Sequence, residues 1–572
     1  MATSKKGIQD LVHSLDQGGL VPVIRTAMFA TLVVTLTLLY LFVQFKGLSN
    51  STAMDQAQIA REIAAGNGFS TKYIRPFAIW QLENADKEVP TENFPDFYQS
   101  PLPPFINSIP LKLVQSQWKL EATDLIYIGD RMIAGTAILF FLLSVVVWYF
   151  IGLRLFDKKL SLIGCAMILM TDLFWQFSLS GLPQMLMLLL FSGACWATLK
   201  AMEKKNELVS MLVLLFGAGL LFGLMILCHG AAVWILLGWF VYTAFYFHPR
   251  GIAALVGLAA AMLVVMPWLA RNYSVSGNPL GIAGYELTVP VFTSESGFMR
   301  SISSAPTIGG MAPLNRLKNA VFTHSEQIFA FLGMNIAALA FFASLLHRFK
   351  SNDTSHFRWC IILMWLGAFG GMALCGAQSA VHANQFHVLF VPLFIFYGLA
   401  FLLVLWNRLE VQIPVLRIVF IILLLFLGAL PLLARLSAGP GAAIHWPPYV
   451  PPFIGILGEW YEPDEVIASD MPWAVAWYAN RNAILLPQSV KDFNKISDYR
   501  VLGQSITGLY LTPITGNSRL FSEIYKGPYT EWVFMITRPP NVSGFALPVF
   551  TPLPIDGECI LFADRDRWSK RE

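Results

Sequence analysis

Long, nearly uninterrupted apolar blocks constrain the fold of this chain more than any other feature. A helix of about 20 apolar residues spans the roughly 30 Å hydrocarbon core of a bilayer. The 572 residues are 56% hydrophobic and only 13% charged, with a mean hydropathy of +0.59, which excludes an ordinary soluble protein. We expect about eleven membrane spans, near residues 26–45, 132–152, 160–179, 183–201, 208–228, 231–247, 251–270, 326–346, 358–377, 386–406 and 414–435.

Basic residues in alternate short loops indicate the orientation of these spans. One set of loops carries Lys5, Lys6, Arg154, Lys158, Lys159, Lys204, Lys205, Arg250, Arg348, Lys350, Arg358 and Arg408. Loops rich in lysine and arginine face the cytoplasm. Residues 1–25 are therefore expected to be cytoplasmic, and residues 46–130, 271–325 and 436–572 to be external. The first span lacks a small-residue cleavage motif and is expected to be retained. The basic loops account for the net charge of +4, which gives no reason to expect a nucleic-acid partner.

The C-terminal segment has the pattern of a small α/β domain. A Pro- and Gly-rich linker at residues 440–452 separates it from the transmembrane domain, residues 26–435. The apolar runs 465–468 and 483–486 are typical of short buried strands, and residues 472–478 between them favour a helix. The expected fold is a polytopic α-helical membrane protein with a small C-terminal α/β extracytoplasmic domain.

Asp55 is the acidic residue that follows the first span directly, at the start of the first external loop. The i, i+4 spacing of Ile59 and Ile63 predicts a helix from Asp55 to Ala65 along the membrane surface, ended by Gly66. A carboxylate in this place is suited to accept a proton from the hydroxyl of a substrate. The alternative is a structural role, because an acidic residue at the start of a helix is favoured by the helix dipole.

Five further polar residues are candidates for substrate contacts. Asp172 lies in the third expected span, where an ionisable residue is costly and suggests function, the alternative being an Asp bonded to a neighbouring helix. Arg131 and Arg271 lie at external ends of spans, where a guanidinium group can bind phosphate in a bidentate way or simply reach the interface. Gln385 and His387 precede the tenth span and either contact phosphate or sugar, or hydrate a helix end.

Five segments together carry a resemblance to a known superfamily. They are Asp55 with Ile59-Ala60-Arg61-Glu62 and Gly66-Asn67-Gly68-Phe69, then Ser100-Pro101-Leu102-Pro103-Pro104, Arg131 through Arg154-Leu155-Phe156, Pro267-Trp268 with Arg271-Asn272-Tyr273, and Ser469-Asp470-Met471-Pro472. Their order and spacing resemble the GT-C superfamily of membrane glycosyltransferases. Within it, the chain is most similar to the dolichyl-phosphate-mannose protein mannosyltransferases and the bacterial lipid A aminoarabinose transferases.

The resemblance implies an inverting glycosyltransferase that moves a hexose or pentose from a polyprenyl-phosphate donor to a protein, lipid or cell-surface glycan. It places the reaction at the external face of the membrane, in the periplasm if the membrane is a bacterial inner membrane. Asp55 would be the catalytic base, and the substrate-binding residues would be Arg61, Arg131, Asp172, Arg271, Gln385 and His387. Some relatives use a divalent cation, and the sequence leaves the cofactor open. The acidic residues of the first loop offer oxygen ligands but are expected to be solvated: Glu83, Asp86, Glu88, Glu92 and Asp96.

Three departures from the family pattern keep other functions open. A second acidic residue is missing at Gln56 and again at Gln184, and Gln385 stands where relatives commonly carry Arg. Asp172 and His387 are the candidates for substitutes. One alternative is a non-catalytic protein of the same fold that acts in envelope glycan assembly. The other is a transporter of lipid-linked sugars, which predicts internal pseudo-symmetry, and the sequence shows no repeat.

Overall fold

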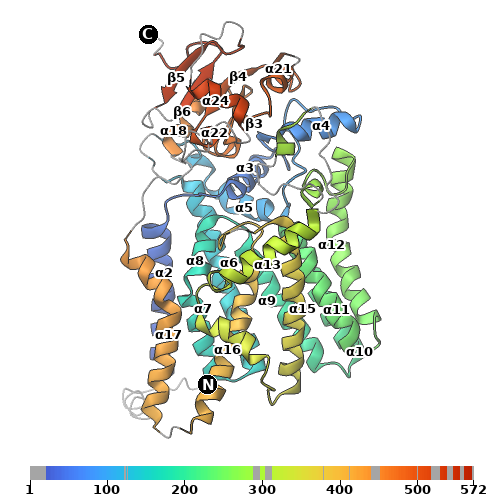
Figure 1. Ribbon diagram of the computed structural model, residues 1–572, viewed down its shortest axis with the longest axis vertical. Helices are drawn as coiled ribbons and strands as arrows, with labels where there is room; N and C mark the ends of the chain where they lie inside the picture. The colour runs from blue at the N-terminus through green and yellow to red at the C-terminus, as the bar shows by residue number, and fades with distance from the viewer. Residues whose placement is uncertain are drawn as a thin grey trace, which may run out of the picture.

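Transmembrane helices form one end of the molecule and a mixed β-sheet forms the other, with short helices packed between them (Figure 1). The computed structural model describes residues 21–121, 124, 126–287, 297–302, 312–377, 379–410, 413–439, 451–498, 500–516, 529–537, 545–553 and 559–569.

The apolar blocks form the expected membrane domain. Among the described residues, eight helices are long and apolar enough to cross a membrane, and a bent pair makes a ninth if it is counted as one span. The eight are Thr26–Gln44 (α2, Val21–Leu38, continued by the π-helical turn η1, Leu39–Gln44), Ile128–Leu155 (α6), Gln184–Glu203 (α9), Leu208–Cys228 (α10), Ile252–Ser276 (α12), Asn352–Cys375 (α15), His387–Arg408 (α16) and Pro414–Ser437 (α17). The chain is therefore an integral membrane protein.

Three of the expected eleven spans take a different form. The span expected at 160–179 is bent by 52° between α7 (Lys158–Met170) and α8 (Asp172–Ser180). The span expected at 231–247 is the short 3-10 turn η3 (Gly230–Ala232) followed by α11 (Val233–Tyr246).

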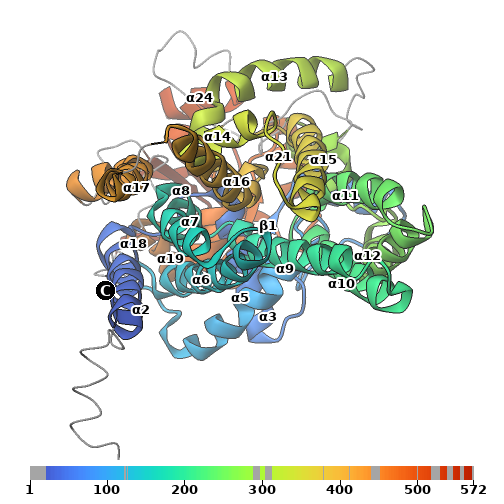
Figure 2. The same cartoon turned by 90° about the horizontal axis from the view of Figure 1, so that it is seen from below.

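The third difference is at 326–346, where the chain forms no single helix. Helix α13 (Ala312–Phe331) ends there, and α14 (Ile336–Ser344) begins anew after an Asn335 cap. Gly333 and Met334 between them adopt left-handed backbone angles, with φ of +69° and +55°, which stop a right-handed helix. Helix α13 runs along the outside of the bundle, beside α14 and α15 (Figure 2).

Small residues let the helices approach closely in the membrane domain. Helices α2 and α17 stand at one side of the bundle and α10 to α12 at the other (Figure 2). A Cβ atom on Gly398 of α16 would lie only 1.7 Å from the carbonyl oxygen of Ala337 in α14. A Cβ atom on Gly219 of α10 would lie 2.1 Å from the carbonyl oxygen of Gly257 in α12. Such contacts replace the hydrophobic driving force that is absent between helices in lipid.

The first external loop folds into three helices above the spans: α3 (Ser51–Ala65), α4 (Pro76–Asn84) and α5 (Leu102–Leu113). Helix α3 begins four residues before the expected start, because the side chain of Asn50 accepts hydrogen bonds from the N–H groups of Thr52 and Ala53. Gly66 ends the helix in a left-handed conformation, as predicted. Asp55 therefore lies in the second turn of α3 and is not the residue that starts the helix.

The C-terminal segment forms the predicted α/β layer, and the first external loop completes its sheet. The strands are β1 (Tyr73–Ile74), β2 (Val466–Ser469), β3 (Asn482–Leu485), β4 (Ile506–Leu511), β5 (Val549–Leu553) and β6 (Cys559–Ala563), in the order β1-β3-β2-β4-β6-β5. The first four are parallel, and β6 and β5 are antiparallel additions. Around them lie α18 (Pro451–Gly455), α19 (Leu457–Trp460), α20 (Pro472–Ala474), η6 (Val475–Ala479), α21 (Val490–Asp498), α22 (Pro513–Gly516) and α24 (Thr530–Thr537).

The described parts of the two external loops pack on each other and on the C-terminal domain. The ring of Phe77 in α4 contacts the rings of Tyr285 and Phe298, both from the second loop. Arg300 is fully buried and donates hydrogen bonds of 2.6 and 2.8 Å to the carbonyl oxygens of Leu486 and Pro487. The described parts of these loops are therefore a packed layer between the membrane domain and the sheet.

Candidate active site

Asp55 is buried, with only 1% of its surface exposed, at a point where α3 meets the rest of the first loop. Its Oδ2 atom pairs with the guanidinium of Arg75 and accepts a 2.6 Å hydrogen bond from the side chain of Gln99. Its Oδ1 atom accepts a single longer hydrogen bond, 3.1 Å, from the side chain of Gln58. A carboxylate oxygen accepts more than one hydrogen bond, so Oδ1 is the less occupied of the two oxygens.

Arg75 lies between β1 and α4 and is held on all sides. Its guanidinium carbon is 4.0 Å from the ring centroids of both Tyr73 and Tyr98, so the cation lies against two aromatic faces. One nitrogen pairs with Asp55, and the other is 3.6 Å from Oδ2 of Asp96. Burial alone lowers the pKa of the Arg75 guanidinium, but Asp55, Tyr73 and Asp96 raise it above its ordinary value, so the group stays charged.

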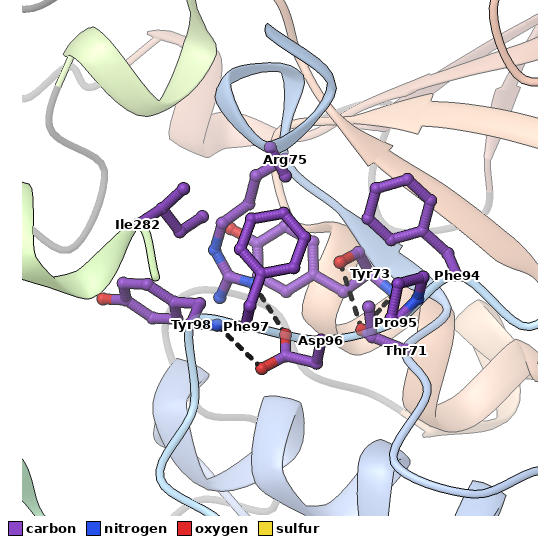
Figure 3. A pocket seen from close by; sticks show the side chains of 10 residues that line it. Thr71, Tyr73, Arg75, Phe94, Pro95, Asp96, Phe97, Tyr98 and Ile282 are labelled. Carbon is purple, nitrogen blue, oxygen red and sulfur yellow. Dashed lines mark hydrogen bonds and ion pairs between the residues drawn. The ribbon is translucent and has the colours of Figure 1, made fainter. Parts of the chain in front are cut away.

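Asp96 is buried against Arg75, which corrects the expectation of a solvated acidic run. The other four acidic residues of that run are exposed, whereas Asp96 is 2% exposed. Its Oδ1 accepts hydrogen bonds from the N–H groups of Tyr98 and Gln99, at 3.0 and 2.7 Å. A small pocket opens beside it, lined by Thr71, Tyr73, Arg75, Ala78, Phe94, Pro95, Asp96, Phe97, Tyr98 and Ile282 (Figure 3). Burial, and then the charge of Asp55, raise the pKa of Asp96, while Arg75 lowers it.

Arg271 joins the same cluster from the C-terminal end of α12. Its guanidinium donates to the backbone carbonyl oxygen of Asp96 and, at 3.3 Å, to that of Phe69. The rings of Trp268 and Phe69 lie 4.8 and 5.3 Å from its guanidinium carbon. The cluster thus combines two carboxylates and two guanidinium groups, a set that can accept a proton and stabilise a developing negative charge.

Solved structures with the same architecture are membrane glycosyltransferases. The structure matches ArnT from Cupriavidus metallidurans in the apo state with a TM-score of 0.55 at 11% identity, covering 95% of this chain and 98% of that chain. ArnT bound to undecaprenyl phosphate matches with a TM-score of 0.54 at 11% identity, covering 96% of this chain and 100% of that chain. The chain has a GT-C fold.

A third GT-C structure is similar over a smaller share of its own length. It is the Archaeoglobus fulgidus oligosaccharyltransferase tethered with an acceptor peptide, with a TM-score of 0.52 at 13% identity, covering 85% of this chain and 69% of that chain. No protein-family model matches the sequence, and no curated protein matches it. The structural comparisons thus confirm the GT-C fold that the sequence motifs predict.

Arg61 of the GT-C motif points to the C-terminal domain and not to Asp55. It is 2% exposed and donates to the carbonyl oxygens of Trp477 and Ala476, at 2.5 and 2.6 Å. Its guanidinium carbon lies 5.0 Å from the centroid of the Trp477 ring. Beside it, the Trp477 side chain donates a 2.7 Å hydrogen bond to the buried carboxylate of Asp130. Arg61 therefore connects α3 to the turn η6 by hydrogen bonds.

Asp172 and Arg131 lie near the first span. Asp172 accepts hydrogen bonds from the hydroxyl of Tyr40 and the side chain of Gln176, and its Oδ2 is 2.9 Å from Nε of Arg435. The alternative of a buried Asp bonded to neighbouring helices describes this arrangement. Arg131 is half-buried, and its guanidinium carbon is 5.7 Å from the centroid of the Phe42 ring. Within the described ranges, Arg131 forms no ion pair.

Gln385 and His387 are fully buried, so the expectation that they hydrate a helix end is wrong. His387 accepts a 3.0 Å hydrogen bond at Nδ1 from the Trp365 side chain, and its Nε2 is 3.0 Å from Nδ1 of His324. Gln385 accepts at Oε1 from the N–H of Val388, whereas its Nε2 has no hydrogen-bond partner among the described residues. These residues form a second polar cluster among α13, α15 and α16.

Sequence reasoning missed Arg75 and Gln99 of the Asp55 cluster, and it placed Asp96 in a solvated run. Gln99 directly precedes the Pro-rich turn that leads into α5, whereas Arg75 has no comparable local signal. In the part of the chain that the structure describes, no group of three or more His, Cys, Asp or Glu side chains is placed to hold a metal ion. The arrangement therefore gives no support to a particular cation site.

Proposed function

We propose that this chain is an inverting glycosyltransferase that takes a hexose or pentose from a polyprenyl-phosphate donor. The observation that carries the proposal is the buried Asp55 carboxylate, held by Arg75 and Gln99 on a helix directly behind the first span of a GT-C fold. ArnT and the archaeal oligosaccharyltransferase share that fold. A protein, a lipid or a cell-surface glycan would be the acceptor.

In the proposed reaction, Oδ1 of Asp55 accepts the proton of the acceptor hydroxyl while the hydroxyl oxygen attacks the anomeric carbon. The bond between the anomeric carbon and the phosphate oxygen breaks on the opposite face, so the configuration inverts and polyprenyl phosphate leaves. Arg271, in the same cluster, and Arg131, at the start of α6, are the candidates to stabilise the charge of that phosphate. Asp172, Gln385 and His387 remain candidate substrate contacts from the membrane side.

A turnover assay tests the proposal. The purified chain in lipid nanodiscs would be offered radiolabelled hexoses and pentoses on undecaprenyl and dolichyl phosphate, together with a membrane extract as the source of acceptor. We expect release of polyprenyl phosphate and transfer of label from at least one donor. If the lipid-linked sugars bind but none is consumed, the protein is a non-catalytic member of the fold. This alternative is favoured by the three side chains that already donate hydrogen bonds to Asp55.

The proposed location of the reaction is the external face of the membrane, the periplasmic face if the membrane is a bacterial inner membrane. The basic short loops support this orientation, and helix α3, which carries Asp55, lies at the same end of the molecule as the sheet (Figure 1). An alkaline phosphatase fused after Glu572 is expected to be active, because this enzyme requires export. An active fusion to a reporter that works only in the cytoplasm would reverse the orientation.

A further inference from the structure

Arg75 is shared between two carboxylates, and its position relative to both is fixed. Its Nη2 atom pairs with Asp55, and its Nη1 atom is 3.6 Å from Asp96. The rings of Tyr73 and Tyr98 lie 4.0 Å from the guanidinium carbon, so the plane of the cation is held between aromatic faces. One guanidinium therefore lies close to two buried carboxylates in a fixed geometry, and Arg271, which donates to the backbone carbonyl oxygen of Asp96, is the second cation of the cluster.

Gln99 connects the same two carboxylates by a second route. Its backbone N–H donates a 2.7 Å hydrogen bond to Oδ1 of Asp96, and its side chain donates a 2.6 Å hydrogen bond to Oδ2 of Asp55. Asp96 lines the small pocket, facing Arg75 (Figure 3), whereas Asp55 is not among the residues that line it. The two acids thus have different surroundings but both contact Arg75 and Gln99.

We infer that Asp96 is a positioning residue that acts through Arg75 to keep the Asp55 carboxylate basic. The inference rests on the proposed function, in which Asp55 accepts a proton. In this role Asp96 supplies the second carboxylate that the sequence lacks at Gln56 and Gln184. Asp172, the substitute suggested by the sequence, pairs with Arg435 instead.

The physical reason is that the positive charge of Arg75 interacts with two carboxylates, Asp55 and Asp96, at the same time. An arginine close to a single carboxylate favours its ionised form strongly, which makes that carboxylate a weak base. A second carboxylate on the same guanidinium offsets this effect and repels the charge of the first. Removing the charge of Asp96 leaves Arg75 to pair with Asp55 alone, so Asp55 should accept the proton of the acceptor hydroxyl less readily.

The substitution Asp96→Asn tests this role, because it removes the charge and keeps an oxygen for the N–H groups of Tyr98 and Gln99. We expect the acid limb of the pH profile of kcat/KM to move to lower pH by about one unit. The plateau should fall by less than about tenfold, since a weaker base transfers the proton less readily. Glu92→Gln is the matched control from the same loop, because Glu92 is exposed, and its profile should equal that of the wild type.

A loss of rate with an unmoved acid limb would overturn the inference and leave Asp96 a structural residue, and an unchanged profile would also overturn it. If Asp96→Asn is not recovered folded, Asp96→Ser removes the same charge and retains a hydroxyl acceptor. Infrared titration compares the wild type with Asp96→Asn without turnover. The signal of the Asp55 carboxylate is obtained as the difference between each protein and the same protein carrying Asp55→Asn. A wild type that consumes no donor refutes the proposed function, while the infrared comparison still decides whether Asp96 acts on the Asp55 carboxylate.

Discussion

Replacing Asp55 with Asn should lower the rate of sugar transfer by about 10²–10⁴-fold, the usual cost of losing a general base. The amide keeps the size of the carboxylate and an oxygen that can face Arg75 and Gln99. Hydrogen bonds with Thr71 and with the N–H of Lys72 fix the side-chain amide of Gln58, so the new NH₂ group loses only the longer 3.1 Å hydrogen bond at Oδ1. The measurement is kcat for release of polyprenyl phosphate, at equal amounts of folded protein in nanodiscs.

Glu62→Gln is the control for the loss of a buried acid from the same helix. Glu62 is 4% exposed, accepts a 2.7 Å hydrogen bond from Asn67 and lies 3.5 Å from Lys72. It lies about two turns beyond Asp55 on α3 and has no role in the proposed reaction. Its variant should transfer sugar at close to the wild-type rate. Transfer by Asp55→Asn within about threefold of the wild type would show that Asp55 is structural, since a general base contributes at least about 10²-fold.

Replacing Arg75 with Gln should destabilise the folded protein by about 3–5 kcal/mol, because two buried carboxylates lose their shared cation. Asp55 and Asp96 are both at most 2% exposed, so water cannot replace the guanidinium. The measurement is the free energy of unfolding in detergent by denaturant titration. Arg154→Gln is the matched control: the side chains of its ion pair with Glu203 are 32% and 38% exposed, and its loss should cost at most about 1 kcal/mol.

The pH dependence of this loss gives a second check. Burial and the charge of Asp55 raise the pKa of Asp96, and Arg75 lowers it, so loss of Arg75 raises that pKa further above its value in the unfolded chain. Asp96 then ionises less readily in the folded state, so the deficit is small below the unfolded pKa of about 4 and grows as the pH rises. The double variant Arg75→Gln with Asp96→Asn should recover part of the stability at neutral pH. A deficit that does not change with pH would show that lost packing, and not charge, is the cause.

Local patterns in the sequence predicted the elements that depend on nearby residues. The apolar blocks gave most of the spans, the i, i+4 spacing and Gly66 gave α3, and the short apolar runs gave β2 and β3 to within one residue. Asp55 was singled out because it follows the first span directly. These features are written in windows of about 20 residues or fewer, in which periodicity is informative.

Features that depend on distant partners could not be predicted in this way. The two-residue strand β1 has no strand signal of its own and exists because it pairs with β3. Asp96 looks like part of an exposed acidic run, and only the tertiary packing of Tyr73 and Tyr98 around Arg75 explains its burial. Arg61 belongs to a motif of the first loop, but its hydrogen-bond partners lie in the π-helical turn η6.

The pairing of β1 with β3 also sets the order in which the protein can be completed during synthesis. Arg61 and its acceptor at Trp477 are 416 residues apart in the chain, and Tyr73 is separated from its partner Ala483 by a similar length of chain. When a ribosome has made Asp55 and Arg75, the strand that will fix the segment between them does not yet exist. A chain released just before β3 is made contains every residue of the proposed site but lacks the strand that pairs with β1. An unfinished chain lacks β3 and the turn η6, the partners of β1 and Arg61, so it cannot hold the Asp55 cluster as the full chain does.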